Sequence, residues 1–210
     1  MSGAVLGPDS LWRCPWALST PEYLAYHDDE WGRPVSTVEG LYERMTLEAF
    51  QSGLSWITIL RKRENFRRAF AGFRPERVAA FTSDDIELLL GDPGIVRNRA
   101  KIAAAIENAR LVIDLGPRFA DIVLSYRVTG RPRPAAGEVR ATSPESIGMA
   151  RELKDLGFRF VGPTTAYATM QAIGLVDDHV VGCFAPPPVW PEANSAPETR
   201  PKPEPESGCD

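Results

Sequence analysis

Long apolar stretches are missing from this sequence. No run of about 18 consecutive apolar residues occurs, so the chain is expected to have no transmembrane helix. The first 14 residues lack the charged and then apolar segments of a secretory signal peptide, and we therefore expect a cytoplasmic protein with no membrane partner. The 210 residues, of which 43% are hydrophobic, are enough for one compact domain with a buried core.

Cysteine and histidine are both rare. The three cysteines, at positions 14, 183 and 209, are too few and too unevenly spaced for a disulfide framework. In a reducing compartment, isolated cysteines are free thiols, nucleophiles or metal ligands. The sequence has only two histidines, and each lies near one of these cysteines: His27 follows Cys14 by thirteen positions, and His179 precedes Cys183 by four.

Two cysteines and two histidines can form the closed tetrahedral shell of one structural zinc ion. A helical turn would place His179 and Cys183 on one face, and the ion would join the N-terminal segment to the end of the globular part. Four protein ligands leave no position for a water molecule, which argues against a catalytic metal. We expect Asp28 and Asp178 to accept hydrogen bonds from the neighbouring imidazoles. The alternative is two unrelated pairs with buried thiols.

A strongly positive net charge, which would mark a nucleic-acid-binding protein, is also absent, because the formal net charge is −4. Five acidic and two basic residues fall in 186–210, so the preceding 185 residues carry about −1. Two segments, 61–68 and 97–101, are densely basic. Local patches decide the attraction for phosphate, although such runs are also typical of solvated helix faces.

Strand-like alternation is absent, and the helical signals predict an all-α fold. Capping residues and Pro or Gly breaks place helices over approximately 21–29, 37–51, 55–70, 75–81, 82–90, 96–115, 118–126, 143–157 and 164–173. The rest of the chain after residue 185 is rich in Pro and Glu, a composition typical of disorder. We therefore expect a helical domain over residues 1–185 and a disordered tail over 186–210.

One carboxylate falls on an otherwise apolar helix face. On the predicted helix 37–51, Glu48 shares a stripe with Leu, Met and Ala side chains. A buried carboxylate needs partners, and such groups gather at functional sites. The turn that follows, residues 53–56, offers a glycine and a tryptophan that could line a flat pocket. The alternative is a glutamate at the edge of the stripe, paired with an arginine.

A glycine-rich turn, residues 91–95, separates two predicted helices and suggests a second functional region. Backbone N–H groups at the start of the second helix can bind a phosphate, and nearby cations would add to this attraction. The predicted DNA contacts are Gly94, Arg97, Arg99 and Lys101. Taken alone, such a turn is a weak signal.

Several short segments together resemble the DNA-3-methyladenine glycosylase I family. They are Cys14–Trp16, Tyr26–Gly32, Leu47–Trp56, Arg61–Asn65, Gly157–Gly162 and Asp178–Cys183. The resemblance is specific because these blocks agree at once, in similar order and spacing, from about Trp12 to Cys183. It implies a helix-hairpin-helix glycosylase fold with a zinc site.

The resemblance also implies roles for single residues. It puts Cys14, His27, His179 and Cys183 at the zinc-ligand positions of the family, Glu48 at the position that reads the lesion base, and Trp56, Tyr26 and Trp16 at aromatic pocket positions. It implies that the catalytic Asp of related helix-hairpin-helix glycosylases is absent, and we assign no role to Asp121. Pro15 and Phe50 depart from the family pattern, where Gly and a polar residue are expected.

The expected reaction is hydrolysis of the N-glycosidic bond of 3-methyladenine in alkylated double-stranded DNA, a step of base-excision repair. A base inside a duplex must be flipped out, and stacking on Trp56 would favour the flipped base by roughly 1–3 kcal/mol. Leu54 is the candidate wedge that fills the vacated space. Alkylation at N3 makes adenine a cationic, good leaving group, which the Glu48 carboxylate would attract while water attacks the sugar. We expect a monomer.

Two other functions fit part of the pattern. A non-catalytic, zinc-stapled DNA-binding module explains the basic segments, but leaves Glu48 and the aromatic cluster without a task. A zinc hydrolase of small molecules could use Glu48 as a base, but it needs a water molecule on the metal.

Overall fold

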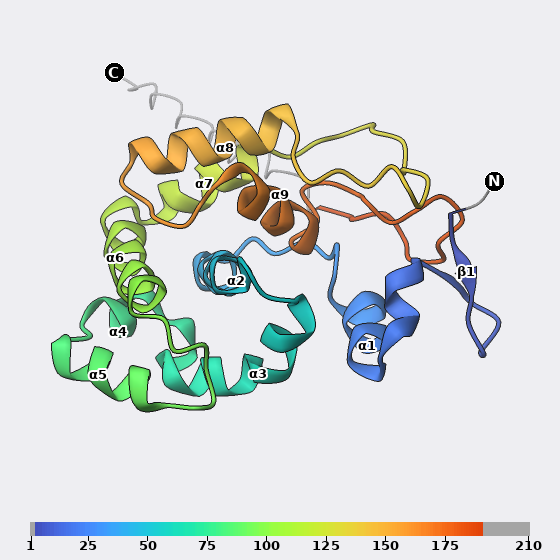
Figure 1. Cartoon of the computed structure of the whole chain (residues 1–210). Coiled ribbons are helices and arrows are strands. Elements are labelled where there is room, and N and C mark those ends of the chain that lie inside the picture. Colours follow the sequence, from blue (N-terminus) through green and yellow to red (C-terminus); the bar gives the residue numbers. More distant parts are fainter. Residues whose placement is uncertain (1–2, 191–210) are drawn as a thin grey trace, which may run out of the picture.

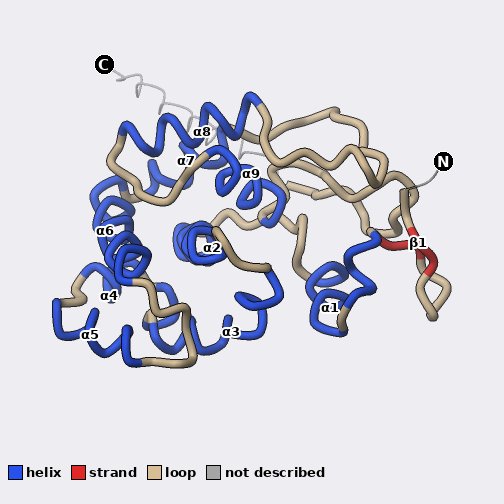
Figure 2. The backbone as a smooth tube through the Cα atoms, in the orientation of Figure 1, coloured by secondary structure: helices blue, strands red, loops and turns tan. Residues whose placement is uncertain are grey.

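The computed structural model describes residues 3–190, and this part of the chain is almost entirely helical (Figures 1 and 2). An N-terminal region holds β1 (Val5–Leu6), β2 (Trp12–Arg13), the 3₁₀ helix η1 (Pro15–Ser19) and α1 (Pro21–Asp29). The helices that follow are α2 (Val38–Gln51), α3 (Trp56–Ala69), the 3₁₀ helix η2 (Ala71–Phe73), α4 (Pro75–Ala79), α5 (Ser83–Gly91), α6 (Arg99–Leu115), α7 (Pro117–Ser125), α8 (Pro144–Asp155) and α9 (Pro163–Ala172). None of them is long and apolar enough to cross a membrane.

The short antiparallel pair β1–β2 is the exception to the all-α prediction. Val5 pairs with Arg13 and Leu6 with Trp12. Each strand has only two residues, which is too short to produce a detectable alternation of polar and apolar side chains. The fold is therefore mostly helical, with one small hairpin at the N-terminal edge.

Capping residues set most helix boundaries where the sequence predicts them. The side chains of Thr20, Thr37 and Thr82 each accept a hydrogen bond from a backbone N–H in the first turn of α1, α2 and α5. The helix predicted from Val96 begins three residues later, because the side chain of Asn98 caps it by accepting from the Lys101 amide. Ser55 precedes α3 but pairs with the Thr58 hydroxyl instead of capping the backbone.

Helix α2 is the centre of the fold. It lies in the middle of Figure 1 and packs against α3, α6, α7 and α9. Phe50 near its C-terminal end is buried between Phe66 and Phe70, with ring centroids 4.8 and 5.7 Å away. Phe50 thus belongs to the core, and its departure from the family pattern does not place it in a pocket. Because α2 is surrounded, a polar side chain on it is either buried or faces a cavity.

The predicted boundary at residue 185 stays a prediction, and residues 191–210 lie outside the described part. Of the tail segment, 186–190 are described. Trp190 donates a hydrogen bond from Nε1 to the Gly174 carbonyl at 2.9 Å and packs against the main core.

Candidate functional site

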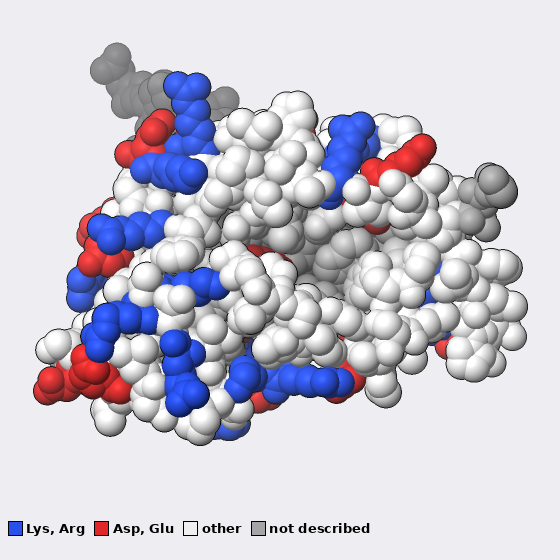
Figure 3. All heavy atoms as spheres, in the orientation of Figure 1, with Lys and Arg blue, Asp and Glu red and all other residues white. Residues whose placement is uncertain are grey.

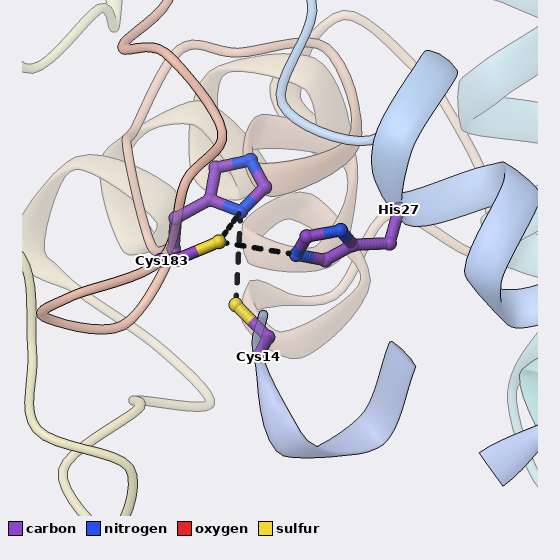
Figure 4. A group of neighbouring side chains, drawn as sticks. Cys14, His27 and Cys183 are labelled. Carbon is purple, nitrogen blue, oxygen red and sulfur yellow. Dashed lines mark hydrogen bonds between the residues drawn. The ribbon is translucent and has the colours of Figure 1, made fainter. Parts of the chain in front are cut away.

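Four buried side chains from both ends of the described chain meet at one point. The ligand atoms of Cys14, His27, His179 and Cys183 all lie within 4.8 Å of one another. The Cys183 sulfur lies 3.4 Å from His27 Nε2 and 3.6 Å from His179 Nδ1 (Figure 4). The Cys14 sulfur also lies 3.6 Å from His179 Nδ1. Bonds of about 2.3 Å to sulfur and about 2.0–2.1 Å to nitrogen around a tetrahedral zinc ion would separate sulfur and nitrogen by about 3.6 Å. The donor set therefore fits a tetrahedral metal ion.

The two C-terminal members of this cluster lie in a loop. A helical turn would also bring His179 and Cys183 to one face, but helix α9 ends at Ala172 and residues 178–181 have no helical structure. A tight turn, in which the Cys183 amide donates to the Val180 carbonyl at 3.0 Å, brings the two side chains together instead. Hydrogen bonds from the Cys14 thiol and the two imidazoles hold the pKa of the Cys183 thiol below its usual value, which favours the metal-binding thiolate.

Only one of the two aspartates predicted to support the imidazoles does so. Asp28 Oδ1 lies 2.8 Å from His27 Nδ1, and both Asp28 oxygens accept from Arg13. Burial raises the pKa of Asp28, but the hydrogen bonds from Arg13 and His27 outweigh this effect and leave it below its usual value. The prediction for Asp178 is wrong, because its carboxylate pairs with Tyr167 and Gln171 rather than with His179.

A glycine permits the close packing around His179. Gly32 follows α1 with φ of +76°, and a Cβ atom added there would lie 3.0 Å from His179 Nε2. Any other residue would therefore meet both backbone strain and a steric contact with the imidazole.

A cavity of about 510 Å³ lies beside the metal-type cluster. Its lining residues, mostly aromatic or polar, are Pro15, Trp16, Tyr23, Tyr26, Trp31, Glu48, Gln51, Trp56, Ala136, Val139, Ala168, Gln171, Asp178 and Val180. In the space-filling view, this face of the molecule is hollowed near its middle, between the α2–α3 side and the α1 side (Figure 3). The structure thus brings together all three predicted pocket aromatics and Glu48.

The aromatic rings form a continuous wall. Trp16 makes edge contacts with Trp31 at 5.1 Å and Tyr23 at 5.6 Å between ring centroids, and Tyr26 lies 5.4 Å from Trp56. The Tyr23 hydroxyl accepts a hydrogen bond from the Ile57 amide at 2.9 Å, which ties α1 to the start of α3. Such a wall suits a flat, π-bonded ligand.

Glu48 is the buried carboxylate that the helix pattern predicts, and it is only 6% exposed. Desolvation raises its pKa to about 8, although the positive charge of Arg44 acts in the opposite direction. The Arg44 guanidinium is engaged elsewhere, donating to Glu30 at 3.0 Å. Glu48 is therefore largely protonated at neutral pH in the free protein, and a cation entering the cavity would favour its ionised form.

Asp178 is a second carboxylate at the same cavity, and the sequence analysis missed it there. Its Oδ2 accepts from the Tyr167 hydroxyl at 2.6 Å and from Gln171 at 2.8 Å. Within residues 3–190, its buried Oδ1 has no hydrogen-bond partner, and the same is true of the indole nitrogen of Trp56. Buried polar atoms are nearly always paired, so these two mark hydrogen-bonding capacity for a ligand.

Comparisons with known proteins agree with this arrangement. The family model described as methyladenine glycosylase matches residues 16–186. The chain belongs to the methyladenine glycosylase family. DNA-3-methyladenine glycosylase 1 of Escherichia coli is 45% identical over 182 residues, covering 83% of this chain and 97% of that protein. The counterpart in Haemophilus influenzae is 40% identical over 178 residues, covering 81% and 96%.

Solved structures give the same result for the fold. The crystal structure of a 3-methyladenine DNA glycosylase I matches with a TM-score of 0.78 at 46% identity, covering 83% of this chain and all of that one. The mostly helical architecture of this methyladenine glycosylase family member is therefore shared with a solved relative.

The predicted wedge of this family member lies outside the cavity lining. Leu54 is 39% exposed in the turn between α2 and α3, and its carbonyl accepts a hydrogen bond from the Gln51 side chain at 2.7 Å. The turn thus presents an apolar side chain to solvent next to the cavity residues Gln51 and Trp56.

The predicted DNA contacts fall into two groups. Arg97 and Arg99 are exposed at the start of α6, with Arg99 paired to Glu87 at 2.7 Å. The Gly94 amide donates a hydrogen bond to Asp92 Oδ1 at 2.6 Å. Lys101 has a different place from the one predicted, because it is 8% exposed and its ammonium donates to backbone carbonyls inside the protein. Its side chain is not available for the expected phosphate contact.

Proposed function

We propose that this protein is a DNA glycosylase that hydrolyses the N-glycosidic bond of 3-methyladenine in alkylated DNA. The observation that carries the proposal is a buried Glu48 in an aromatic-walled cavity of about 510 Å³, which is large enough for a purine base. The names of its relatives, which are 3-methyladenine glycosylases, support the same substrate.

The aromatic side chains provide the binding energy for a flipped base. Trp56 and Tyr26 line the cavity, and stacking of one base on an aromatic ring contributes roughly 1–3 kcal/mol. This energy offsets part of the cost of unpairing the base from the duplex. Leu54 is the side chain that we assign to the space left in the helix.

Glu48 supplies selectivity for a positively charged base. A 3-methyladenine nucleotide carries the charge that shifts Glu48 towards its ionised form, and its exocyclic amine can donate to the carboxylate. Neutral adenine lacks the charge, and Glu48 then keeps its proton. The proposed role of Glu48 is thus to favour the cationic lesion and hold it, while the alkylated base leaves readily and water attacks the sugar.

Asp178 is assigned as a second acceptor in this pocket. An exocyclic amine has two N–H groups, and the unpaired Oδ1 of Asp178 can take a hydrogen bond that Glu48 does not. The hydrogen bonds from Tyr167 and Gln171 fix the orientation of the carboxylate before the base arrives. A base with a keto oxygen at this edge would offer no N–H group to the ionised Glu48 or to Oδ1 of Asp178.

A structural zinc ion is the metal that best fits the Cys14, His27, His179 and Cys183 cluster. Two sulfur and two nitrogen donors at tetrahedral spacing are typical of such sites. A bound ion would supply rigidity rather than chemistry, since the four side chains fill its coordination shell. We assign these residues to holding the α1 wall of the cavity against the loop that carries Asp178.

The α5–α6 hairpin is the proposed phosphate-binding element, in the manner of a helix-hairpin-helix unit. Arg97 and Arg99 are exposed at or just before the start of α6, and Lys and Arg side chains lie on the side of the molecule that holds α3, α5 and α6, with acidic side chains beside them at α5 (Figure 3). The arginines at the start of α6 and the basic side chains of α3 suit a phosphate backbone.

Base selectivity tests this function directly. The protein should release 3-methyladenine from alkylated duplex DNA about 10-fold or more faster than 3-methylguanine, and unmodified bases hardly at all. The reason is that unpaired buried acceptors cost roughly 1–3 kcal/mol when a keto oxygen faces them. Single-turnover release, followed by chromatography of the freed bases, measures both rates. An absence of release of any alkylated base by metal-loaded protein would leave only the DNA-binding alternative.

A further inference from the structure

Lys101 occupies a buried position at the start of the hairpin's second helix. It lies in the first turn of α6, and its backbone amide donates to the side chain of Asn98, the N-cap. Its ammonium reaches across to the end of α2, where it donates to the Phe50 carbonyl at 2.9 Å and to the Ser52 carbonyl at 2.6 Å. Burial lowers the pKa of Lys101, so these two acceptors must compensate for lost water contacts.

The Phe50 carbonyl that Lys101 binds lies in the last turn of α2, and the Ser52 carbonyl directly follows this helix. The last four carbonyls of a helix have no intrahelical donor, and α2 ends at Gln51. A cation placed there also meets the negative end of the helix dipole. Immediately after, Gly53 adopts φ of +84°, which turns the chain sharply towards α3. Lys101 therefore fixes the point at which the turn carrying Leu54 leaves α2.

A second set of contacts holds the same two regions together. Lys62 on α3 donates to the Pro93 carbonyl of the hairpin at 2.6 Å. A Cβ added at Gly94 would lie 3.1 Å from the side chain of Asn65, also on α3, so the hairpin packs directly against this helix. Since α3 begins at Trp56, two residues after Leu54, the turn 52–55 is held at its start by Lys101 and at its end by α3.

We propose that Lys101 is a positioning residue that joins the phosphate-binding hairpin to the turn 52–55. When the hairpin binds the DNA backbone, Leu54 is then held at a fixed distance from the stacked bases. Insertion of Leu54 as a wedge needs no further movement of the turn 52–55. This inference rests on the proposed function, but its consequence is different: Lys101 contributes to base flipping and not to the electrostatic attraction for DNA.

The test uses the full-length protein with Lys101→Met, which keeps the length of the side chain but removes its donors. Two readouts separate the roles: the salt dependence of DNA affinity, and the fluorescence of 2-aminopurine placed beside an abasic site, which reports unstacking. We expect an unchanged salt slope and a loss of at least about 5-fold in the fraction unstacked. A phosphate contact would instead lower the slope by about one unit, as we expect for Arg97→Ala, the matched control.

A double-variant cycle shows whether Lys101 acts through Leu54. If it does, Lys101→Met combined with Leu54→Ala should reduce unstacking no further than Leu54→Ala alone. Additive losses, or an altered salt slope, would overturn the proposal. If Lys101→Met does not fold, Gly53→Ala perturbs the same turn through its positive φ and should give the same phenotype; normal unstacking in that variant would also overturn it.

The two hypotheses fail separately. The unstacking readout requires no cleavage, so wild-type protein that unstacks DNA but releases no base would remove the glycosylase function and leave the Lys101 inference standing. Wild-type protein that releases 3-methyladenine, together with a Lys101→Met variant that unstacks DNA normally, would remove the Lys101 inference and leave the glycosylase function standing.

Discussion

Replacing Glu48 with Gln should reduce the release of 3-methyladenine by roughly 10- to 100-fold while the fold and metal content stay intact. Gln preserves the shape of the side chain but cannot become an anion, so the cationic base loses a charged hydrogen bond of about 1.5–3 kcal/mol. Single-turnover release from methylated DNA measures the loss. Equal rates for wild type and Glu48→Gln would remove this residue from the mechanism.

The pH dependence gives this prediction a second signature. Because burial raises the pKa of Glu48 to about 8, the anionic form of the free enzyme should increase as the pH rises from 6 to 8.5. Wild-type kcat/KM for 3-methyladenine release should rise over this range, whereas Glu48→Gln should show a low and nearly flat profile. A wild-type profile that falls with pH would contradict the assignment of the ionised carboxylate.

Thermal stability provides the matching control for folding. In the unfolded chain Glu48 ionises near its ordinary pKa of 4.5, whereas burial raises its pKa to about 8 in the folded chain. The unfolded state therefore releases the Glu48 proton at a lower pH than the folded state. The free energy of unfolding of the wild type falls as the pH rises from 4.5 to 8, and Glu48 causes no loss of stability below pH 4.5. Glu48→Gln should thus melt at or above the wild-type temperature at pH 8. A lower Tm there would indicate that lost activity reflects misfolding.

Replacing both Cys14 and His179 with Ala should remove the metal and markedly destabilise the protein. The purified wild type should contain about one zinc ion per chain, and loss of a structural metal costs several kcal/mol. In the double variant, the buried side chains of His27 and Cys183 would also no longer have a metal ion to bind. Metal analysis by mass spectrometry, combined with thermal melting, measures both effects.

The third cysteine supplies the control. Cys209 lies outside the described residues and outside the predicted ligand set, so Cys209→Ala should keep a full complement of zinc and the wild-type Tm. Full metal occupancy in the Cys14→Ala, His179→Ala double variant would contradict the ligand assignment.

Much of this site is readable from local sequence patterns, and the exceptions have a common cause. The scarcity of His and Cys favoured the four side chains that meet, with two unrelated pairs as the alternative, and the stripe on helix 37–51 indicated the Glu48 that is buried, with a place at the edge of the stripe as the alternative. The prediction for Lys101 was wrong because a basic run does not reveal which of its members faces the protein. That depends on α2 ending opposite α6, which is a tertiary contact.

The same reason explains Asp178. Its position beside a ligand histidine suggested a partner for the imidazole, but the conformation of the loop turns its carboxylate to Tyr167 and Gln171 on α9. Tyr23 and Trp31 were likewise missed as cavity residues, since two aromatic side chains near α1 carry no signal that separates a pocket wall from a core.

The cavity draws its walls from widely separated parts of the chain: Trp16 and Tyr26 come from near the N-terminus, Glu48 and Trp56 follow, and Asp178 lies more than 120 positions later. A ribosome makes these segments in order, and the loop with His179 and Cys183 is made after the segments that hold Trp16, Tyr26, Glu48 and Trp56. Helices α2 to α6 can pack on one another before then, because the contacts that they make with one another lie within residues 38–115. The nascent chain can therefore form the α5–α6 hairpin while the cavity still lacks a wall, and the proposed pocket for the damaged base is completed only after the segment with Asp178 has been made.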